Sequence, residues 1–377
     1  MECKTIKALN LQDFSQYKKD TTLFYIAFYV MAFAKAFGLH SGHKSYLLMF
    51  VVSGLLLGIR LLVMEKTWVD YLKVGLLLGP CGLIFLCSRE TTLLFTCLFL
   101  TASKNVDFET CMKGTCRIYF ATVPLRIVLN LLGVVEGGSK PLFAYDSAGK
   151  QIITGYISGY GYISPNSLFA VVFIAVLLLF YIRRDKLKIR DMAVGTVFMM
   201  AVYAVTRCRT GLIVYFAVLV GLLLYCYLRQ KERLLRAYCG LLAVGSLAVG
   251  VVFPLIYDRE NEIMRFIAFQ GFTGRTEWAQ NAMMKAGVSL FGAGGIFSDI
   301  LYVDVLVNSG IVGLAFLLVG MAVLFFAFCK AKNYVGLICV SGMILYACME
   351  QFPLNIAMNP FALYLGTAAL FKNKTTT

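Results

Sequence analysis

Charged residues are scarce in this chain of 377 residues. They make up 15% of the sequence, against 60% apolar residues, and the mean hydropathy is +0.78. A soluble domain carries roughly 25% charged residues, so a soluble protein is excluded. The regular alternation of apolar and polar residues that marks a membrane β-barrel is also missing, because the apolar residues form long runs. The composition therefore predicts an all-α, polytopic membrane protein.

The apolar runs predict about twelve transmembrane helices in a single integral membrane domain that covers residues 1–377. Each run approaches the roughly 20 residues that a helix needs to cross the hydrocarbon core. The fourth run is the shortest, and a re-entrant fourth segment would invert the sides of all later loops. The predicted spans are 22–39, 45–64, 70–87, 89–103, 117–135, 162–182, 191–206, 210–228, 235–256, 301–328, 334–350 and 356–371.

Acidic residues are few beside basic ones, 20 against 35, which gives a net charge of +15. With twelve spans and both termini in the cytoplasm, 22 of the 35 Lys and Arg residues fall on the cytoplasmic side, as the positive-inside rule requires. The excess charge is thus explained by topology, and no nucleic-acid partner is implied. The lipid bilayer is the expected surrounding, and no cleavable signal peptide is expected.

Clusters of metal ligands are also missing from the sequence. Most of the 12 cysteines stand alone in apolar runs, where cysteine behaves as a small hydrophobic residue. Cys111 and Cys116 have a C-x4-C spacing without further ligands nearby, which does not indicate a zinc site. We therefore expect no metal and no cofactor.

Two segments that this topology places outside the membrane are too long to be simple connections. Residues 136–161 and 257–300 comprise 26 and 44 residues. Loops longer than about 15 residues are uncommon and are frequently functional.

Arginine is concentrated on the outer side, where membrane insertion disfavours positive charge. Arg209 lies at the junction of the seventh and eighth spans, and Arg275 lies in the last long loop. A guanidinium offers a planar fork that suits phosphate, so both are candidates for binding an anionic ligand, with Arg207 as the alternative to Arg209. Arg259 and Arg265 are expected to pair with acidic residues of their own loop.

Three cations fall inside the predicted spans. Arg126 lies in mid-span, two residues after Pro124, and an ionisable group at that depth either faces a cavity or pairs within the bundle. Both interpretations stay open. Lys35 and Arg60 lie near span ends, where long side chains can reach the interface, and they are assigned no role.

The outer segments also contain tyrosines and acidic residues. Tyr160 belongs to a stretch rich in glycine and tyrosine, whose rings suit either a sugar or an interfacial tyrosine belt. Asp299 precedes the tenth span, Glu350 closes the eleventh and Asp146 lies in the first long loop. These three carboxylates are candidates for a general base or are solvated loop charges.

Several short patterns in residues 160–350 occur in one order and on one side. Together they resemble the O-antigen polymerase and ligase superfamily, the Wzy and WaaL type of bacterial polysaccharide enzymes. The patterns are Ser-Pro-Asn-Ser at 164–167, Arg-Cys-Arg-Thr-Gly at 207–211, Gly-Arg-Thr-Glu-Trp at 274–278, Gly-Ala-Gly at 292–294, Asp-Ile-Leu-Tyr at 299–302 and Gly-Ile-Val-Gly-Leu at 310–314.

The resemblance implies a membrane glycosyltransferase of the C-like class, which acts on undecaprenyl-pyrophosphate-linked oligosaccharide by metal-independent, inverting transfer. It would polymerise repeat units into surface polysaccharide at the outer face of the bacterial cytoplasmic membrane. A flippase and a chain-length regulator would be partner proteins.

The resemblance also implies roles for single residues. Arg209 and Arg275 would hold the donor pyrophosphate, and Asp299 would act as base or orient the acceptor. Ser164 replaces the family's common histidine, and Ile300 replaces its usual asparagine. The remaining substrate-binding candidates are Arg207, Arg126, Asn166, Tyr160, Tyr302 and Glu350.

Two other functions remain open. A flippase or transporter of the same lipid-linked sugar would suit twelve spans, although transporters commonly show internal repeats and midplane sites, and we find no repeat. A ligase would share the fold, but the sequence has no histidine at the position of the ligase histidine, which favours a polymerase. The first outer loop, 40–44, has no acid, which argues against metal-dependent membrane glycosyltransferases.

Overall fold

The computed structural model describes residues 11–145, 151–228, 231–272 and 274–371. Within these ranges the chain is mostly helical, with fourteen α-helices and one two-stranded sheet. The helices of the first third are α1 (Leu11–Ala36), α2 (Lys44–Val63), α3 (Trp68–Ser88), α4 (Thr92–Ala102) and α5 (Phe108–Leu131). The next group is α6 (Pro165–Ile182), α7 (Ile189–Thr206), α8 (Arg209–Tyr227), α9 (Glu232–Leu247) and α10 (Phe253–Ile256). The last group is α11 (Glu262–Phe272), α12 (Arg275–Ala286), α13 (Leu301–Lys330) and α14 (Tyr334–Tyr346).

Seven helices in the described part of the chain are long and apolar enough to cross a membrane. Six of them are α2, α3, α6, α7, α8 and α13, and the seventh is the continuous stretch Glu232–Ile256, in which the π-helix η2 (Ala248–Val252) joins α9 to α10. Four further apolar helices are shorter, at Thr21–Ala36, Thr92–Ala102, Tyr334–Tyr346 and Pro360–Leu370. These helices support the prediction of a helical membrane protein, whereas the predicted number of twelve spans is not confirmed.

The C-terminal segment differs most from the expected regular span at 356–371. It consists of short 3₁₀ and π turns, η3 (Phe352–Leu354), η4 (Pro360–Ala362) and η5 (Leu365–Leu370). The helical part Pro360–Leu370 rises only about 16 Å at roughly 1.5 Å per residue, about half of the hydrocarbon thickness. Pro353 and Pro360 stand at the starts of the two 3₁₀ turns, where a proline limits extension of the helix toward the N-terminus.

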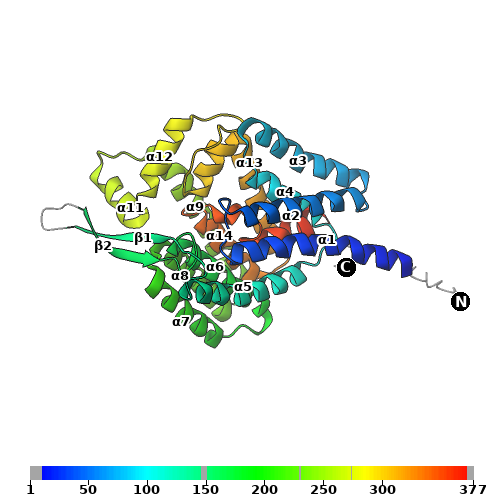
Figure 1. Ribbon diagram of the computed structural model, residues 1–377, viewed down its shortest axis with the longest axis horizontal. Coiled ribbons are helices and arrows are strands. Elements are labelled where there is room, and N and C mark those ends of the chain that lie inside the picture. Colours follow the sequence, from blue (N-terminus) through cyan, green and yellow to red (C-terminus); the bar gives the residue numbers. More distant parts are fainter. Residues whose placement is uncertain (1–10, 146–150, 229–230, 273, 372–377) are drawn as a thin grey trace.

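The long loop 136–161 contains a β-hairpin, so the expectation of a purely α-helical fold was incomplete. Strand β1 (Ser139–Tyr145) pairs antiparallel with β2 (Gln151–Ser158), in a register that joins Ser139 to Ser158 and has an irregularity at Leu142/Phe143. The hairpin projects from the helices at the left of Figure 1, and α1 begins at the opposite end. Residue Asp146 lies outside the described residues.

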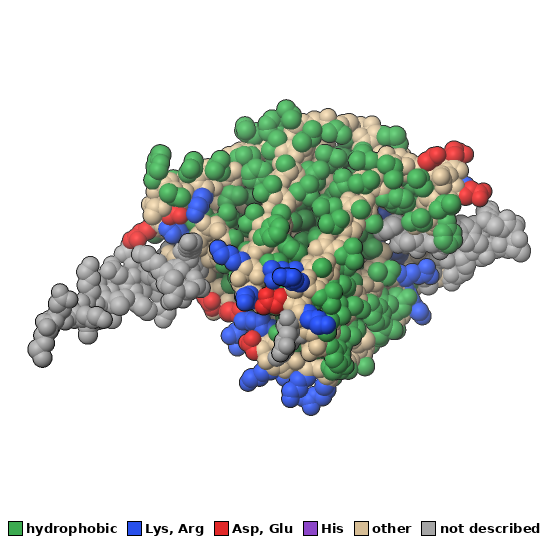
Figure 2. Space-filling view, turned by 180° about the vertical axis from the view of Figure 1, so that it is seen from behind, with side chains coloured by type: hydrophobic (Ala, Val, Ile, Leu, Met, Phe, Trp, Pro, Cys, Tyr) green, Lys and Arg blue, Asp and Glu red, His purple; other side chains and the backbone are tan. Residues whose placement is uncertain are grey.

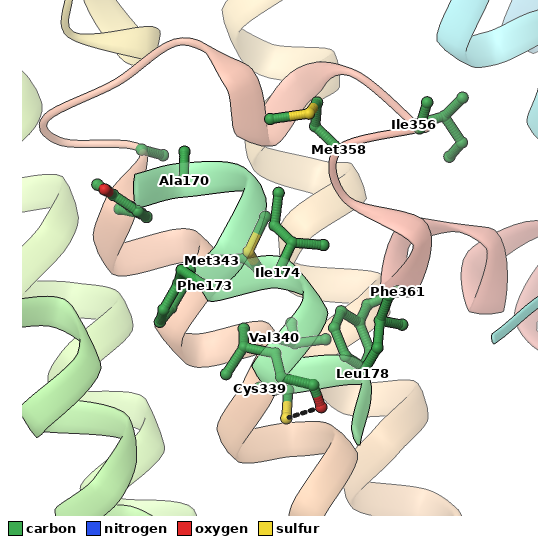
Figure 3. Packing of buried hydrophobic residues seen from close by; sticks show 14 of the residues in the cluster. Ala170, Phe173, Ile174, Leu178, Cys339, Val340, Met343, Ile356, Met358 and Phe361 are labelled. Atoms are coloured by element: carbon green, nitrogen blue, oxygen red, sulfur yellow. Dashed lines mark hydrogen bonds between the residues drawn. The ribbon is translucent and has the colours of Figure 1, made fainter. Parts of the chain in front are cut away.

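Helix α6 forms the centre of the bundle. It is apolar on all sides, and 14 of its residues are buried, as expected for a helix without a solvent-facing side. Figure 3 shows α6 residues from Ala170 to Leu178 packed against α14 through Val340 and Met343, and against the C-terminal segment through Phe361.

The surface is apolar over a wide area. Leu62 of α2 and Leu72 of α3 are 85% and 58% exposed, and Val197 of α7 is 71% exposed. Figure 2 shows hydrophobic side chains over much of one face, while lysine and arginine gather lower on it. A soluble protein rarely exposes so large an apolar patch, which fits a lipid-facing surface.

Helix α13 is broken at Gly310, and this break positions the loop before it. Gly310 has φ 72° and ψ −172°, a conformation open essentially to glycine alone. The loop packs into the break, where the amides of Ile311 and Val312 donate to the carbonyls of Ser289 and Leu290 at 3.0 and 3.1 Å. The backbone groups freed by the break are thus satisfied within the protein, as the membrane interior demands.

Arg60, to which the sequence assigned no role, lies in the last turn of α2. It is fully buried and donates to the carbonyls of Ala102 at 2.5 Å and Lys104 at 2.7 Å. These carbonyls lie at the C-terminal end of α4, where a cation is favoured by the helix dipole.

Candidate functional site

The candidate site forms where the ends of five helices meet. Arg275 is the first residue of α12, Thr210 lies in the first turn of α8 and Asn166 lies in the first turn of α6. Asp299 comes just before α13 and Glu350 follows α14. Loops and helix ends can present polar groups that the apolar helix bodies cannot, so the chemistry gathers at this end of the bundle.

The first turn of α6 shows how the sequence builds one of these ends. Ser164 caps the helix by accepting from the amide of Ser167 at 3.1 Å, and Pro165 occupies the first helical position. Both residue types favour a helix start. Ser164 therefore has a structural role as the N-cap of α6, and Asn166 in the same turn contacts Glu350 in the site.

Arg275 is the centre of the site and contacts three partners. Its Nη2 donates to Oε1 of Glu350 at 2.7 Å, its Nε to Oδ2 of Asp299 at 3.3 Å and its Nη1 to Oγ1 of Thr210 at 3.3 Å. Oε1 of Glu350 also accepts from Nδ2 of Asn166 at 3.3 Å. The Arg275 side chain is only 7% exposed, against 21% for Asp299 and 19% for Glu350. One buried guanidinium thus organises two carboxylates that remain partly accessible.

The charges at this site are not balanced, because one guanidinium faces two carboxylates. Burial by itself would lower the pKa of Arg275, but Glu350 and Asp299 raise it above its ordinary value, so the guanidinium stays charged. Burial raises the pKa of Glu350; Arg275 opposes this shift and the Asp299 carboxylate adds to it. The net effect shifts the pKa of the Glu350 carboxyl upward, toward the protonated form.

A cavity of about 1350 Å³ lies beside these groups. It is lined by Arg275, Asp299, Glu350 and Asn166, and its other walls carry hydroxyl groups and apolar rings, including Trp278. Binding pockets for small molecules typically combine such an apolar lining with a few converging polar groups.

Gln351 ties together the two loops that carry the carboxylates. Its Nε2 donates to the carbonyl of Ser298, directly before Asp299, and to Oδ1 of Asp304 at 2.9 Å. Asn308 donates to the same Asp304 oxygen at 2.9 Å. This network fixes the start of α13 against the end of α14, and with it the spacing of Asp299 and Glu350.

The two arginines at the start of α8 are not brought into this cluster. Arg207 and Arg209 are exposed and do not line the cavity. Arg207 ends α7 in the left-handed conformation with φ 52°. Only Thr210, the next residue, reaches Arg275. A role of Arg209 in holding pyrophosphate stays a prediction.

The deep cation Arg126 pairs within the bundle rather than facing the cavity. Its Nε and Nη2 donate to the carbonyl of Gly161 at 2.9 and 2.6 Å, and its guanidinium lies over the Phe37 ring at 4.7 Å. Of the two interpretations left open by the sequence, the structure favours the structural one.

The two tyrosine candidates also lie away from the cavity walls. Tyr302 is completely buried, and its hydroxyl contacts Ser246 at 2.9 Å and the carbonyl of Ile344 at 3.1 Å. Tyr160 is half-buried and has φ 47° in the turn between β2 and α6. The expected pairing of Arg259 within its loop is confirmed, since it contacts Glu277 at 3.5 Å.

Sequence reasoning missed Lys35, His40 and Lys140, which line the cavity from α1, from the short loop 37–43 and from β1. Lys140 lay within a loop already singled out by its length. No local pattern marked Lys35, because its placement depends on how α1 packs.

Among the described residues, no group of three or more His, Cys, Asp or Glu side chains could hold a metal ion. No family model, curated protein or solved structure matches the chain. The site must therefore be interpreted from its own geometry.

Proposed function

We propose that this protein is a glycosyltransferase that polymerises undecaprenyl-pyrophosphate-linked oligosaccharide repeat units at the outer face of the bacterial cytoplasmic membrane. The observation that carries this proposal is the cluster of Arg275, Asp299 and Glu350 in the wall of a large cavity, at the helix ends of an apolar bundle. The order of short sequence patterns around these residues supports the same function.

The cavity suits a substrate that is part lipid and part sugar. Its charged groups could contact phosphate and hydroxyl groups, while aromatic residues such as Trp278 and Phe297 offer flat apolar faces of the kind on which sugars stack. A volume of about 1350 Å³ exceeds the 300–1,000 Å³ of ordinary ligand sites, which leaves room for a donor and an acceptor.

The proposed reaction is a single displacement at the anomeric carbon of the donor chain. Asp299 accepts the proton of the acceptor hydroxyl as the new bond forms between that oxygen and the anomeric carbon. The bond from the anomeric carbon to the pyrophosphate oxygen breaks, and undecaprenyl pyrophosphate leaves with the electron pair. Arg275 orients Asp299 and stabilises negative charge that develops nearby.

Two substitutions test the assignment in cells that supply the lipid-linked repeat unit. Asp299→Asn and Arg275→Ala are expected to lower chain extension by roughly 10²-fold or more, the usual contribution of a general base or a charge-stabilising group. Single repeat units should still reach the outer face. Glu262→Gln, an exposed carboxylate of the same loop, is the matched control and should extend chains normally.

The side of the membrane on which single repeat units accumulate distinguishes a polymerase from a flippase. If single repeat units accumulate on the cytoplasmic side in the two variants, the protein is a flippase and the polymerase proposal fails. If extension continues at the wild-type rate in both variants, the Arg275 and Asp299 cluster is not the catalytic site.

A further inference from the structure

Lys35 is a cation inside the cavity without an opposite charge. It lies in the last turn of α1 and lines the cavity. Its Nζ lies 4.3 Å from the centre of the Tyr46 ring. Among the described residues, the ammonium group of Lys35 forms no ion pair and no hydrogen bond. An ammonium group withdrawn from water ordinarily needs a partner.

Two other charged groups in the cavity wall form ion pairs, and a third lies near a carboxylate. Arg275 faces Asp299 and Glu350, and Glu277 contacts Arg259 at 3.5 Å. Lys140 lies near enough to Glu350 to help lower that group's pKa. Among the described residues, Lys35 is therefore the cation of the cavity wall at the α1 end, and no carboxylate pairs with it.

His40 provides a second donor at this end. Its Nδ1 accepts from the amide of Gly42 at 3.2 Å, so the neutral ring carries its proton on Nε2, where it is free to donate. Burial lowers the pKa of His40, and His43, Lys35 and Arg126 lower it further. Lys35 and Arg126 are thus cations close enough to act on the His40 ring.

An apolar wall continues from Lys35. The ring of Tyr46 lies 6.3 Å from that of Phe50, and Phe50 stacks on Phe95 at 4.0 Å. All three rings line the cavity. A ligand that follows this wall would combine an anionic head with a hydrocarbon chain.

We propose that Lys35 and His40 bind the phosphate group of a lipid, with its hydrocarbon chain along Tyr46, Phe50 and Phe95. This inference rests on the proposed function, in which the lipid is the pyrophosphate carrier of the donor chain. It places the pyrophosphate at the α1 end of the cavity, whereas the sequence resemblance had placed it on Arg209 and Arg275. The guanidinium of Arg275, already matched by two carboxylates, is then left to orient Asp299.

The binding of undecaprenyl pyrophosphate to the purified full-length protein in detergent tests this assignment. Lys35→Met should weaken binding roughly tenfold or more, since a charge-assisted hydrogen bond is lost, and Lys35→Arg should retain most of the affinity. Lys73→Met is the matched control, because Lys73 is also half-buried beside an aromatic ring, Phe371, but does not line the cavity. Equal affinities of Lys35→Met and Lys73→Met would overturn the proposal.

A parallel titration with phosphatidylglycerol distinguishes the two sources of a lipid phosphate. Weakened binding of the carrier alone supports a carrier-specific site, and weakened binding of both lipids supports a general site for lipid phosphate. His40→Gln, in a loop, provides a second variant should Lys35→Met fail to fold, and it should also weaken binding of the carrier.

The chain contains only two histidines, so NMR of the histidine-labelled protein gives an independent measurement. An anion beside His40 should raise its pKa, because it would offset the neighbouring cations. The His40 resonance is therefore expected to titrate at higher pH in saturating undecaprenyl pyrophosphate, and His43→Gln assigns the two signals. An unchanged pKa of His40 would contradict the site.

Failure of this inference is distinguishable from failure of the proposed function. If the wild-type protein binds the carrier through Lys35 but transfers no sugar, the phosphate site is supported and the proposed glycosyltransferase function is contradicted. If the Lys35→Met variant extends chains with unchanged KM and kcat, the glycosyltransferase function is supported and the phosphate site at Lys35 is contradicted.

Discussion

Arg275 holds two carboxylates apart, and the stability of the site depends on it. Without the guanidinium, Asp299 and Glu350 would lose the ion pairs that hold both of them, at 3.3 and 2.7 Å. Removing one partner of a buried ion pair destabilises a protein more than removing both partners, because the remaining charge is left uncompensated.

A double-mutant cycle at Arg275 and Glu350 makes this measurable. Arg275→Met is expected to lower the free energy of unfolding by about 2–3 kcal/mol, and Glu350→Gln in the same chain should restore much of that loss. Thermal unfolding of the four proteins in one detergent gives the coupling between the two sites. Additive effects would show that Arg275 and Glu350 do not interact.

At this scale the sequence identified several residues of the cluster, but not all of the contacts around it. Arg275, Asp299, Glu350 and Asn166 were candidates from their residue types and positions, and the structure brings them together. Arg209 was a candidate for the same reasons, yet it lies outside the cavity, because the direction of a side chain at a helix start depends on the turn before it. Lys35 could not be found, since its lack of a counter-charge exists only once α1, α2 and the hairpin are packed.

At the scale of elements, the broken helix α13 sets the position of Asp299. A Cβ atom added at Gly310 would collide with the carbonyl of Leu290, and one at Gly292 would collide with the carbonyl of Asn308. The two glycines allow the backbones of the loop and of α13 to approach closely enough for direct hydrogen bonds. The sequence singled out Gly-Ala-Gly at 292–294 as a short pattern, but it did not reveal what this segment packs against.

Gly310→Ala should destabilise the protein by about 2 kcal/mol or more, because it adds strain in a conformation reserved for glycine to a clash with Leu290. Gly320→Ala, in the regular part of the same helix, is the control. Its nearest neighbour would be Leu365 at 3.8 Å, so it should be neutral or stabilise by about 0.5–1 kcal/mol. Equal melting temperatures for the two variants would contradict the role of Gly310.

The elements also show where a hydropathy pattern is insufficient. The helices α2, α3, α6, α7, α8 and α13 follow from long apolar runs, which force the backbone to satisfy its own hydrogen bonds. The β-hairpin was missed although its signal was present, since residues 151–158 are rich in β-branched and aromatic residues and a polar, glycine-containing stretch precedes them. The irregular C-terminal segment was missed because an apolar run predicts burial in the membrane, but does not distinguish an α-helix from short 3₁₀ and π turns.

At the scale of the whole molecule, an apolar helical bundle contains a cavity with charged groups at one end. The long segments 136–161 and 257–300, which hold the hairpin, α11 and α12, lie toward the end of the bundle opposite the start of α1 (Figure 1). The charge distribution of the sequence predicts that the long loops and the N-terminus lie on opposite sides of the membrane. A cavity that opens among these loops suits chemistry on a lipid-linked substrate better than passage through the membrane.

The purified protein in lipid nanodiscs, supplied only with undecaprenyl-pyrophosphate-linked repeat units, tests the central claim most directly. No nucleotide sugar or divalent metal is added, and the products are separated by length. The account predicts a ladder of lipid-linked oligosaccharides that grows by whole repeat units and is lost in Asp299→Asn. Single repeat units that remain unextended beside correctly folded protein would contradict it.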